Sequence, residues 1–511
     1  MNIAQKFLDN LLQKPERILF SAISSGGHII WQTSHTEILE QVLQILSCIK
    51  KAGIVKGERV AISFSKNSLL VPTHIAILAA GAVVVPLNSA LTEREMAAVL
   101  DKAEVSLAIV EDRVFERVSK YAFNTTYPWW VKGESFQSSK DIHSLAQVLG
   151  NKDRLDLCVE QVEENDLALM LFTSGTTGRP KGVGLSHKNI AANLQSLIVE
   201  AWKIDEGDKL LHALPVHHIH GLGLGIYGTL YAKNSTVFLE KFDPTVVVNA
   251  VRSEKVTLFM GVPTMYSRIL DVAEQSDFTT MRLFVSGSAP LSTELFRKFQ
   301  EKFGITILER YGLTETIINS TNPLDGIRKA GTVGLALNGV EIEVFDPETF
   351  QKLSRGQTGE VWIRGANVFA GYWRDEESTK AAFHHDWFRT GDLGVFDEDG
   401  YLKIVGRIKE LIIVGGSNIS PSEVEIVFEK EPYFVEYAVA GLPDADLGEK
   451  VALFAVLREG EDESRVRRRL QEIADKELAA YKRPREYLFV ESLPRNAMGK
   501  VERGKLKYFM K

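Results

Sequence analysis

Cysteine is nearly absent from the 511-residue chain, and basic residues are in no surplus. The two cysteines, Cys48 and Cys158, are far apart and form no C-x-x-C pair, which excludes a disulfide framework and a thiolate metal site. This usage fits a reducing, cytoplasmic setting. Sixty basic against 67 acidic residues leave a net charge of −7, so the composition predicts no nucleic acid as a bulk partner.

Proline is also scarce, with 16 residues against 39 glycines. Hydrophobic residues make up 45% and charged residues 25%, which is ordinary globular usage and excludes collagen-like, low-complexity and disordered classes. At roughly 150 residues per domain, the length predicts about three structural units.

Uninterrupted apolar runs are rare. Residues 1–20 mix charged and apolar side chains and therefore lack the apolar core of a secretory signal. Residues 69–87 are nearly apolar and long enough to cross a bilayer, but prolines, a histidine and Gly81 interrupt them. We therefore predict a buried helix, a turn at Gly81 and a buried strand, and no integral membrane segment.

Short apolar runs alternate with segments of helical period along most of the chain. This alternation predicts an α/β fold with largely parallel sheets. The predicted strands are residues 60–64, 83–87, 107–110, 167–172, 257–260 and 283–285.

The composition of the chain changes near residue 407, where loops rich in Gly, Thr and Asp give way to a compact pattern of helices and strands. This change predicts a domain of residues 1–407 and a small α+β domain of residues 408–511. Ser420, Pro421 and Glu423 form a capping box with proline at the first helical position. Further expected elements of this unit are strands at 435–439 and 451–457 and a helix along 466–478.

Residues 173–182 read Thr-Ser-Gly-Thr-Thr-Gly-Arg-Pro-Lys-Gly and follow an apolar strand. Glycines let the backbone approach an anion, hydroxyls donate hydrogen bonds, and Arg179 and Lys181 supply positive charge. The spacing is not that of a Walker A loop, because a second strand follows in place of an immediate helix. The segment therefore predicts a phosphate-binding loop of another kind.

This loop resembles the pyrophosphate-binding loop of the AMP-forming adenylate synthetases, which include acyl-CoA synthetases, peptide-synthetase adenylation domains and firefly luciferases. Further motifs of that superfamily recur in order over nearly the whole chain. They are Leu-Pro-Val-His-His at 214–218, Ser-Gly-Ser-Ala-Pro at 286–290, Tyr-Gly-Leu-Thr-Glu at 311–315, Arg-Thr-Gly-Asp-Leu at 389–393, Gly-Arg-Ile-Lys at 406–409 and Leu-Pro-Arg-Asn-Ala-Met-Gly-Lys at 493–500.

The resemblance implies a large N-terminal domain of layered α/β subdomains and a small, mobile α+β C-terminal domain. It also implies an ATP-dependent acid–CoA ligase that forms acyl-AMP with release of pyrophosphate and then an acyl-CoA with release of AMP. Negative charge accumulates on the phosphoryl oxygens in the first step, so catalysis should depend on positioning and fixed positive charge.

The resemblance also implies roles for individual residues, with ATP, Mg²⁺ and CoA as cofactors. Lys500, Thr314, Glu315 and His218 are the expected catalytic residues, Glu315 also holding Mg²⁺, and Lys409 is the expected hinge. The expected ATP- and CoA-binding residues are Thr173, Ser174, Gly175, Thr176, Thr177, Gly178, Lys181, Gly287, Ser288, Tyr311, Asp392, Arg407, Gly415 and Gly416.

The sequence does not identify a single carboxylic acid as the substrate. His218, Gly221, Arg268 and Arg282 are the expected acid-binding residues, and the local sequences are most similar to malonyl- and methylmalonyl-CoA synthetases. An arginine could pair a second carboxylate, which favours a malonate-like diacid, while a fatty acid and an aryl acid stay open. The acceptor is CoA or a separate acyl-carrier protein.

Two other functions, a non-catalytic nucleotide-binding scaffold and a kinase or P-loop ATPase, fit the sequence less well than the ligase. A non-catalytic nucleotide-binding scaffold would not need Thr314, Glu315, Asp392, Arg407 and Lys500 together. A kinase or P-loop ATPase would release ADP, whereas the ligase releases AMP. A zinc site at His217, His218 and His220 is disfavoured, because neighbouring side chains on an extended segment point to opposite sides.

Overall fold

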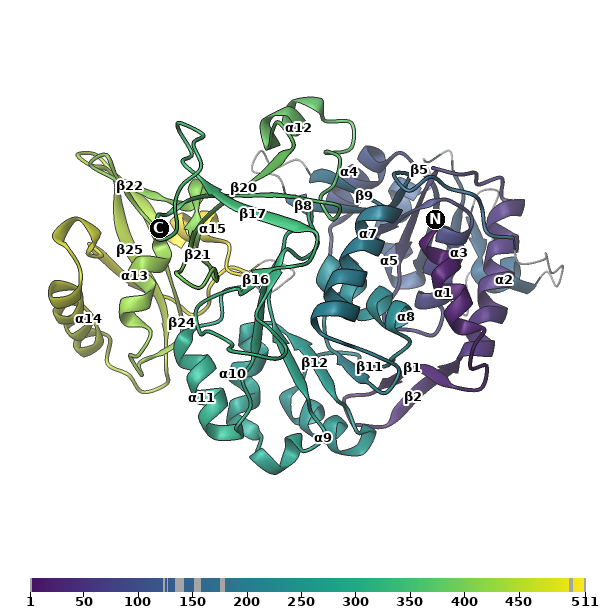
Figure 1. Cartoon of the computed structure of the whole chain (residues 1–511), viewed down its shortest axis with the longest axis horizontal. Helices are drawn as coiled ribbons and strands as arrows, with labels where there is room; N and C mark the ends of the chain where they lie inside the picture. The colour runs from purple at the N-terminus through teal and green to yellow at the C-terminus, as the bar shows by residue number, and fades with distance from the viewer. Residues whose placement is uncertain are drawn as a thin grey trace.

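The computed structural model describes residues 2–122, 125, 127–133, 142–150, 158–174, 180–495 and 500–509. Two large sheets dominate this part of the chain (Figure 1). The first has the order β7 (Ile142–Ser144), β6 (Trp129–Lys132), β5 (Val105–Glu111), β3 (Arg59–Ser63), β4 (Val83–Pro86), β8 (Leu167–Ser174) and β9 (Pro180–Ser186). Its strands are parallel except for the antiparallel pair of β8 and β9.

The second large sheet is parallel in its middle and antiparallel at both edges. Its order is β16 (Leu335–Ala336), β15 (Ser320–Thr321), β14 (Leu308–Tyr311), β13 (Leu283–Ser286), β12 (Leu258–Gly261), β10 (Lys209–His212), β11 (Ser235–Leu239), β1 (Ile18–Ile23) and β2 (Ile29–Ser34).

Helices cover both sheets and fill the space between them. The shared central core is formed by both sheets with α1 (Ile3–Leu11), α2 (His35–Lys51), α3 (Leu70–Ala79), α7 (His187–Leu194) and α8 (Gly228–Ala232). The outer layers are α4 (Glu93–Ala103) and α5 (Asp112–Ala122) on the first sheet, and α9 (Pro244–Glu254), α10 (Pro263–Val272) and α11 (Thr293–Phe303) on the second. The result is a layered α/β architecture.

An antiparallel sheet follows these layers and leads to the end of the chain. It contains β17 (Val340–Phe345), β18 (Gly359–Gly365), β20 (Trp387–Phe396), β19 (Phe383–His384) and β21 (Leu402–Arg407). Further helices described before residue 407 are α6 (Leu145–Gly150), α12 (Glu376–Ala382), the π-helices Gln195–Ala201 and His220–Tyr227, and the 3-10 helix Gln275–Phe278. Strand β21 ends at Arg407, and a 3-10 turn, Ile408–Glu410, begins there.

The small unit after this turn has its own sheet and its own core. The sheet contains β23 (Ser417–Ile419), β22 (Ile412–Val414), β25 (Gly448–Leu457), β24 (Phe434–Asp444) and β26 (Glu486–Phe489), with helices α13 (Pro421–Phe428), α14 (Glu463–Glu477) and α15 (Arg503–Leu506). Figure 1 shows this unit at one end of the molecule, beside α11.

The predicted local structure is confirmed in several places. All six predicted strands between residues 60 and 285 form, and residues 69–87 fold as α3, a turn at Gly81 with φ of 71° and β4. None of the helices in the described residues is both long and apolar enough to cross a membrane. Ser420 and Glu423 make the predicted capping box at the start of α13. Val435 is the exception, because a β-bulge next to it leaves its side chain 64% exposed.

Candidate active site

Tyr311, Asp392 and Arg407 form a polar cluster in which Tyr311 ends β14, Arg407 ends β21, and the buried Asp392 lies within β20. The Tyr311 hydroxyl donates to Oδ2 of Asp392 at 2.6 Å, and Nε of Arg407 lies 2.6 Å from Oδ1. Strand pairing of β20 with β21 places Asp392 directly opposite Arg407. Burial, and then the neighbouring Asp392 carboxylate, raise the pKa of Tyr311 well above its ordinary value, so the phenol stays a hydrogen-bond donor.

Glu315 lies in the turn after β14, close to the phosphate-loop hairpin. Its Oε1 accepts a hydrogen bond from the Tyr372 hydroxyl at 3.0 Å, and burial raises the pKa of its carboxyl. The ammonium of Lys181 lies 4.9 Å from the centre of the Tyr372 ring. A bound cation would stabilise the charged form of Glu315, and a hard carboxylate oxygen is a ligand that Mg²⁺ accepts, so this residue fits the predicted metal.

The predicted phosphate loop is flanked by the antiparallel strands β8 and β9. Thr173 on β8 pairs with Lys181 on β9, and Ser174 pairs with Pro180. Gly175, Thr176, Thr177 and Gly178 lie outside the described residues. A helix begins only after β9, where Ser186 caps α7 through a capping box. The predicted second strand after the loop residues and the later helix are therefore confirmed, and this order differs from that of a Walker A loop.

Gly287 and Ser288 follow β13 and face the end of β14. A Cβ atom on Gly287 would lie 2.4 Å from Cζ of Arg310, so only glycine fits there without displacing the guanidinium. Ser288 has a φ of 69°, and its hydroxyl lies 3.0 Å from Nδ1 of His220. A non-glycine residue in this left-handed region is uncommon and marks a backbone that its surroundings hold in place.

Arg310 is a residue that the sequence analysis missed. Its side chain is buried, with 5% of its surface exposed, and neither Nε nor Nη2 has a hydrogen-bond partner among the described residues. Burial lowers its pKa to about 10, which still leaves it charged near neutral pH. The signal was present in the sequence as a Glu-Arg pair inside an apolar strand directly before the Tyr-Gly-Leu-Thr-Glu motif.

Three histidines, His217, His218 and His220, lie in and just after the 214–218 motif, and His220 lies close enough to Arg310 for the guanidinium to influence its pKa. Burial lowers the pKa of His217 to about 3 and of His218 to about 4, and burial and then Arg310 lower the pKa of His220, so all three rings are neutral near pH 7. Nε2 of each ring is buried without a partner in the described part of the chain. The expectation of an extended segment was wrong, because residues 216–218 form a turn before a π-helix, His220–Tyr227.

Gly221 has a packing role in this π-helix. A Cβ atom there would lie 2.1 Å from the carbonyl oxygen of Pro215, and the Gly221 carbonyl oxygen accepts a hydrogen bond from Nε2 of His212 at 2.7 Å. The close approach of two backbone segments therefore explains the glycine without a direct contact to substrate. Within the described residues, no three His, Cys, Asp or Glu side chains gather as a metal cluster.

Lys500 lies half-buried near Asp392 and Arg407. Burial, and then the Arg407 guanidinium, lower the pKa of its ammonium, while the nearby carboxylates of Glu410 and Asp392 act in the opposite direction. The segment around Lys500 is anchored on both sides. Arg495 pairs with Val501 through a β-bridge and with Glu436 through an ion pair.

Arg503 completes the anchoring of this segment. Its Nη2 lies 2.7 Å and 2.8 Å from the two carboxylate oxygens of Glu425, and its Nη1 lies 3.3 Å from Glu410. Glu410 follows Lys409 directly in the 3-10 turn Ile408–Glu410, so the Lys500 segment is tied to the predicted hinge. Gly415 and Gly416 form the turn between β22 and β23, with φ values of 56° and 85° that favour glycine.

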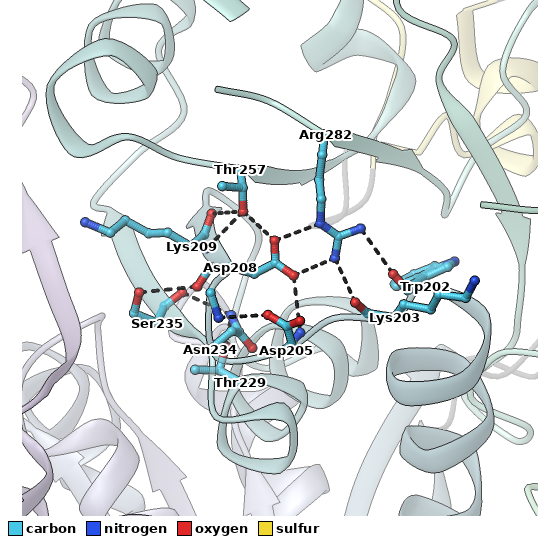
Figure 2. A network of polar contacts seen from close by, with 11 residues as sticks. Trp202, Lys203, Asp205, Asp208, Lys209, Thr229, Asn234, Ser235, Thr257 and Arg282 are labelled. Carbon is cyan, nitrogen blue, oxygen red and sulfur yellow. Dashed lines mark hydrogen bonds and ion pairs between the residues drawn. The ribbon is translucent and has the colours of Figure 1, made fainter. Parts of the chain in front are cut away.

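Arg282 does not belong to the acid-binding set that the sequence predicted. It precedes β13 at the end opposite to Gly287, and Figure 2 shows its guanidinium directed at Asp208. Nε donates to Oδ1 of Asp208 at 2.8 Å, and the other nitrogens donate to the carbonyls of Trp202 and Lys203 at 3.2 Å. This position gives Arg282 a structural role, and the geometry does not support the acid-binding role predicted for it.

Arg268 lies on the second turn of α10, with its side chain exposed. The helix starts two residues after Gly261, at the same edge of the sheet as Gly287. The helix that carries Arg268 therefore begins at the same edge of the sheet as Gly287, whereas Arg282 lies at the opposite edge.

Comparison with known proteins agrees with this geometry. The AMP-binding enzyme family matches residues 10–373, and the AMP-binding enzyme C-terminal domain matches residues 423–500. The chain belongs to the AMP-binding enzyme family. The predicted resemblance, the layered α/β fold and the class of the enzyme, an ATP-dependent acid–CoA ligase, are thereby confirmed.

Relatives of this AMP-binding enzyme act on different acids. A malonate–CoA ligase of Arabidopsis thaliana is 33% identical over 89% of this chain and 78% of its own length. A long-chain-fatty-acid–CoA ligase of Bacillus subtilis is 32% identical over 92% of this chain and 89% of its own length. The crystal structure of ATP-bound MatB from Rhodopseudomonas palustris is 37% identical, with a TM-score of 0.88 and 99% of both chains covered.

Proposed function

We propose that this enzyme activates a short dicarboxylic acid of the malonate type and transfers it to CoA. The observation that carries the proposal is the buried guanidinium of Arg310, whose Nε and Nη2 have no partner among the described residues. These two nitrogens form one edge of the guanidinium and match the two oxygens of a carboxylate. The backbone of Gly287 packs against this edge, and a Cβ atom there would lie 2.4 Å from Cζ and 2.5 Å from Nε of Arg310.

A buried charge without a counter-charge is costly, so the site favours an anionic ligand. The second carboxylate of a diacid is such a ligand, whereas the alkyl chain of a fatty acid would meet a charge. Tyr311, next to Arg310 in the chain, bonds Asp392, the predicted ribose acceptor. An acid that reaches from the nucleotide to Arg310 therefore has to be short.

The remaining acid-binding residues complement this charge. His218 and His220 are neutral near pH 7 because burial lowers the pKa of both rings, so they offer hydrogen bonds without adding charge. Arg268 is a second candidate for the distal carboxylate, from the exposed side. We retain His218 and Arg268 as acid-binding residues.

In the first half-reaction, we propose that Lys500 bridges the acid and the α-phosphate while Thr314 contacts phosphate. Asp392 would accept hydrogen bonds from the ribose, and its bonds to Tyr311 and Arg407 fix its orientation. Glu315 would hold Mg²⁺, which neutralises charge on the phosphates when bound. Thr173, Ser174 and Lys181 would contact the pyrophosphate, together with Gly175, Thr176, Thr177 and Gly178.

In the second half-reaction, the small domain would turn at Lys409 and bring Gly415 and Gly416 to the thiol substrate. We propose CoA as the acceptor in place of a separate carrier protein, because the similar proteins are named CoA ligases. Both cysteines are free thiols, which supports the reducing, cytoplasmic setting that the composition predicts.

The test is a panel of acids with ATP, Mg²⁺ and CoA, scored for AMP release. Malonate, methylmalonate, succinate, propionate, octanoate, palmitate and benzoate cover the open classes. We expect a short diacid to be preferred. Palmitate or benzoate as the best substrate would overturn the proposal.

Arg310→Met tests the carboxylate contact directly. Removing one partner of a buried charge pair typically costs 2–5 kcal/mol, so kcat/KM for malonate should fall by about 10²-fold or more while the KM for ATP changes little. The ratio of propionate to malonate turnover should rise. Arg268→Met measures the second candidate, and Arg282→Met is the matched control from the opposite end of β13. Unchanged malonate use by Arg310→Met would contradict the assignment.

A further inference from the structure

A side chain of the small domain bonds the first turn of a helix in the large domain. Glu429 follows α13, and its Oε1 accepts a hydrogen bond from the backbone N–H of Glu294 at 3.0 Å. Its Oε2 accepts a hydrogen bond from the Thr293 hydroxyl at 3.1 Å. Both donors belong to the start of α11, which lies beside the small domain in Figure 1.

Helix electrostatics make this contact favourable only while the two domains are together. The N–H groups in the first turn of α11 have no partner within the helix, and that end carries partial positive charge. Glu429 stands at the C-terminal end of its own helix, where the partial charge is negative and a carboxylate is disfavoured. Separation of the domains would remove the favourable interaction of Glu429 with the start of α11 and leave its unfavourable interaction with the end of α13.

The contact between Glu429 and α11 lies close in the chain to residues 286–290, part of the proposed acid site. Residues 286–290, which contain Gly287 and Ser288, are followed almost directly by α11. The buried carboxylate of Glu309 accepts a hydrogen bond from the Leu291 N–H at 2.9 Å and fixes the segment between them. Glu429 therefore bonds the element that continues from the proposed acid site.

The same orientation of the small domain keeps Lys500 near the nucleotide cluster. Lys500 is close enough to Asp392 and Arg407 for both to influence its pKa. Lys505, from the same domain, similarly influences Glu95 at the start of α4. Two points of the small domain therefore approach the large domain while Glu429 is bonded to α11.

We infer that Glu429 is a positioning residue for the first half-reaction, whose contact with Thr293 and Glu294 holds the small domain in the orientation that presents Lys500. This inference rests on the proposed function and its hinge at Lys409. Glu429 touches neither acid nor nucleotide in this account. It acts by favouring one orientation of the small domain over the other.

Measuring the two half-reactions separately tests this role. Acid-dependent exchange between ATP and pyrophosphate reports the first, and CoA thioester formation from supplied acyl-AMP reports the second. Glu429→Ala should lower the exchange rate about tenfold, as expected for the loss of hydrogen bonds to a charged group. Thioester formation should stay within twofold of wild type or rise. Glu429→Gln keeps one acceptor oxygen, and its exchange rate should lie between those of wild type and Glu429→Ala.

Glu431→Gln is the matched control. Glu431 is also a half-buried acid of the small domain, and its carboxylate lies 3.9 Å from Arg469 of the same domain. It should leave the ratio of the two half-reactions unchanged. Thr293→Val removes the donor on the other side, and its effect on exchange should be smaller in the Glu429→Ala background than in wild type. An equal loss of both half-reactions in Glu429→Ala would overturn the inference.

A distance measurement keeps this test independent of activity. Spin labels are attached at Lys380→Cys in the large domain and Lys476→Cys in the small domain, where the lysine side chains are 82% and 83% exposed. The full-length chain also carries Cys158→Ser, and the distance between the two labels reports the separation of the domains. Glu429→Ala should shrink the population at the distance seen here, and Glu431→Gln should not. This readout does not depend on which acid the enzyme prefers. If Glu429→Ala leaves the distance distribution unchanged, the positioning role is overturned; if it changes the distribution, the role is supported.

Discussion

Asp392 and Arg407 stand opposite each other on neighbouring strands, with their charged groups 2.6 Å apart. Arg407 is the last residue of β21, and the turn with Lys409 follows at once. The predicted ribose acceptor is therefore paired with the residue from which the small domain departs. A change in orientation at the turn, as the proposed hinge requires, would act first on this ion pair and so on the proposed nucleotide site.

Lys500→Ala should nearly abolish adenylation. The ammonium is a fixed charge near the nucleotide cluster, and loss of one such group typically lowers the rate by about 10²–10³-fold. Thioester formation from supplied acyl-AMP should survive, because the lysine serves only the first step. Pyrophosphate exchange and single-turnover thioester assays measure the two effects, and an equal loss of both would count against the role.

Lys409→Pro should impair thioester formation more than pyrophosphate exchange. Lys409 lies in a 3-10 turn, whose φ values proline adopts, so the orientation seen here should persist. Proline would prevent the change of φ that a domain rotation needs. The ratio of the two half-reaction rates is the measurement, with Lys409→Ala as the control, and an unaltered ratio would refute the hinge.

Arg282→Met should destabilise the protein without changing acid selectivity. It leaves the carboxylate of Asp208, whose side chain is 6% exposed, without its guanidinium partner. Because Arg282 itself is 33% exposed, we expect a loss of about 1–3 kcal/mol in the free energy of unfolding. Thermal unfolding measures the loss, and the KM for the acid should stay within twofold of wild type. A large rise in that KM would return Arg282 to the acid site.

Glu309→Gln should change how stability depends on pH. Burial raises the pKa of Glu309 from 4.5 to about 8 in the folded protein, so the folded state binds its proton more tightly than the unfolded chain. The resulting stabilisation is complete below pH 4.5 and is lost as pH rises to about 8, at up to about 1.4 kcal/mol per pH unit.

Glutamine keeps an acceptor oxygen for the Leu291 N–H and has no proton to lose. The stability of wild type relative to Glu309→Gln should therefore fall between pH 5 and pH 8 and level off above it. Denaturant unfolding at a series of pH values measures the difference. Parallel curves for the two proteins would show that Glu309 does not titrate in this range.

Local structure could be predicted because its causes are local. The apolar run 283–285 and the capping box of Ser420 and Glu423 identify β13 and α13 from neighbours within a few residues. The break of residues 69–87 at Gly81 follows from the turn preference of glycine. The family motifs similarly located the candidate nucleotide site, because each is a short segment with a fixed spacing.

The acid site could not be predicted in the same way. Arg282 and Arg310 are both arginines at the edge of apolar strands, and the sequence singled out Arg282, whereas our proposal rests on Arg310. Strand direction decided the difference, because β13 begins after Arg282 at one edge of the sheet whereas Arg310 lies near the end of β14 at the other. Glu429 and Thr293 are 136 positions apart, and no local pattern indicates their contact.

The order of residues alone sufficed for the helices, the strands, the family and the place of the nucleotide motifs, since hydrogen bonding and side-chain period act over a few neighbours. Packing of the sheets and domains decided which arginine is buried without a partner and which acid bonds α11. Burial and contacts between distant segments depend on the whole folded chain, and these set the charges that the acid and Lys500 encounter.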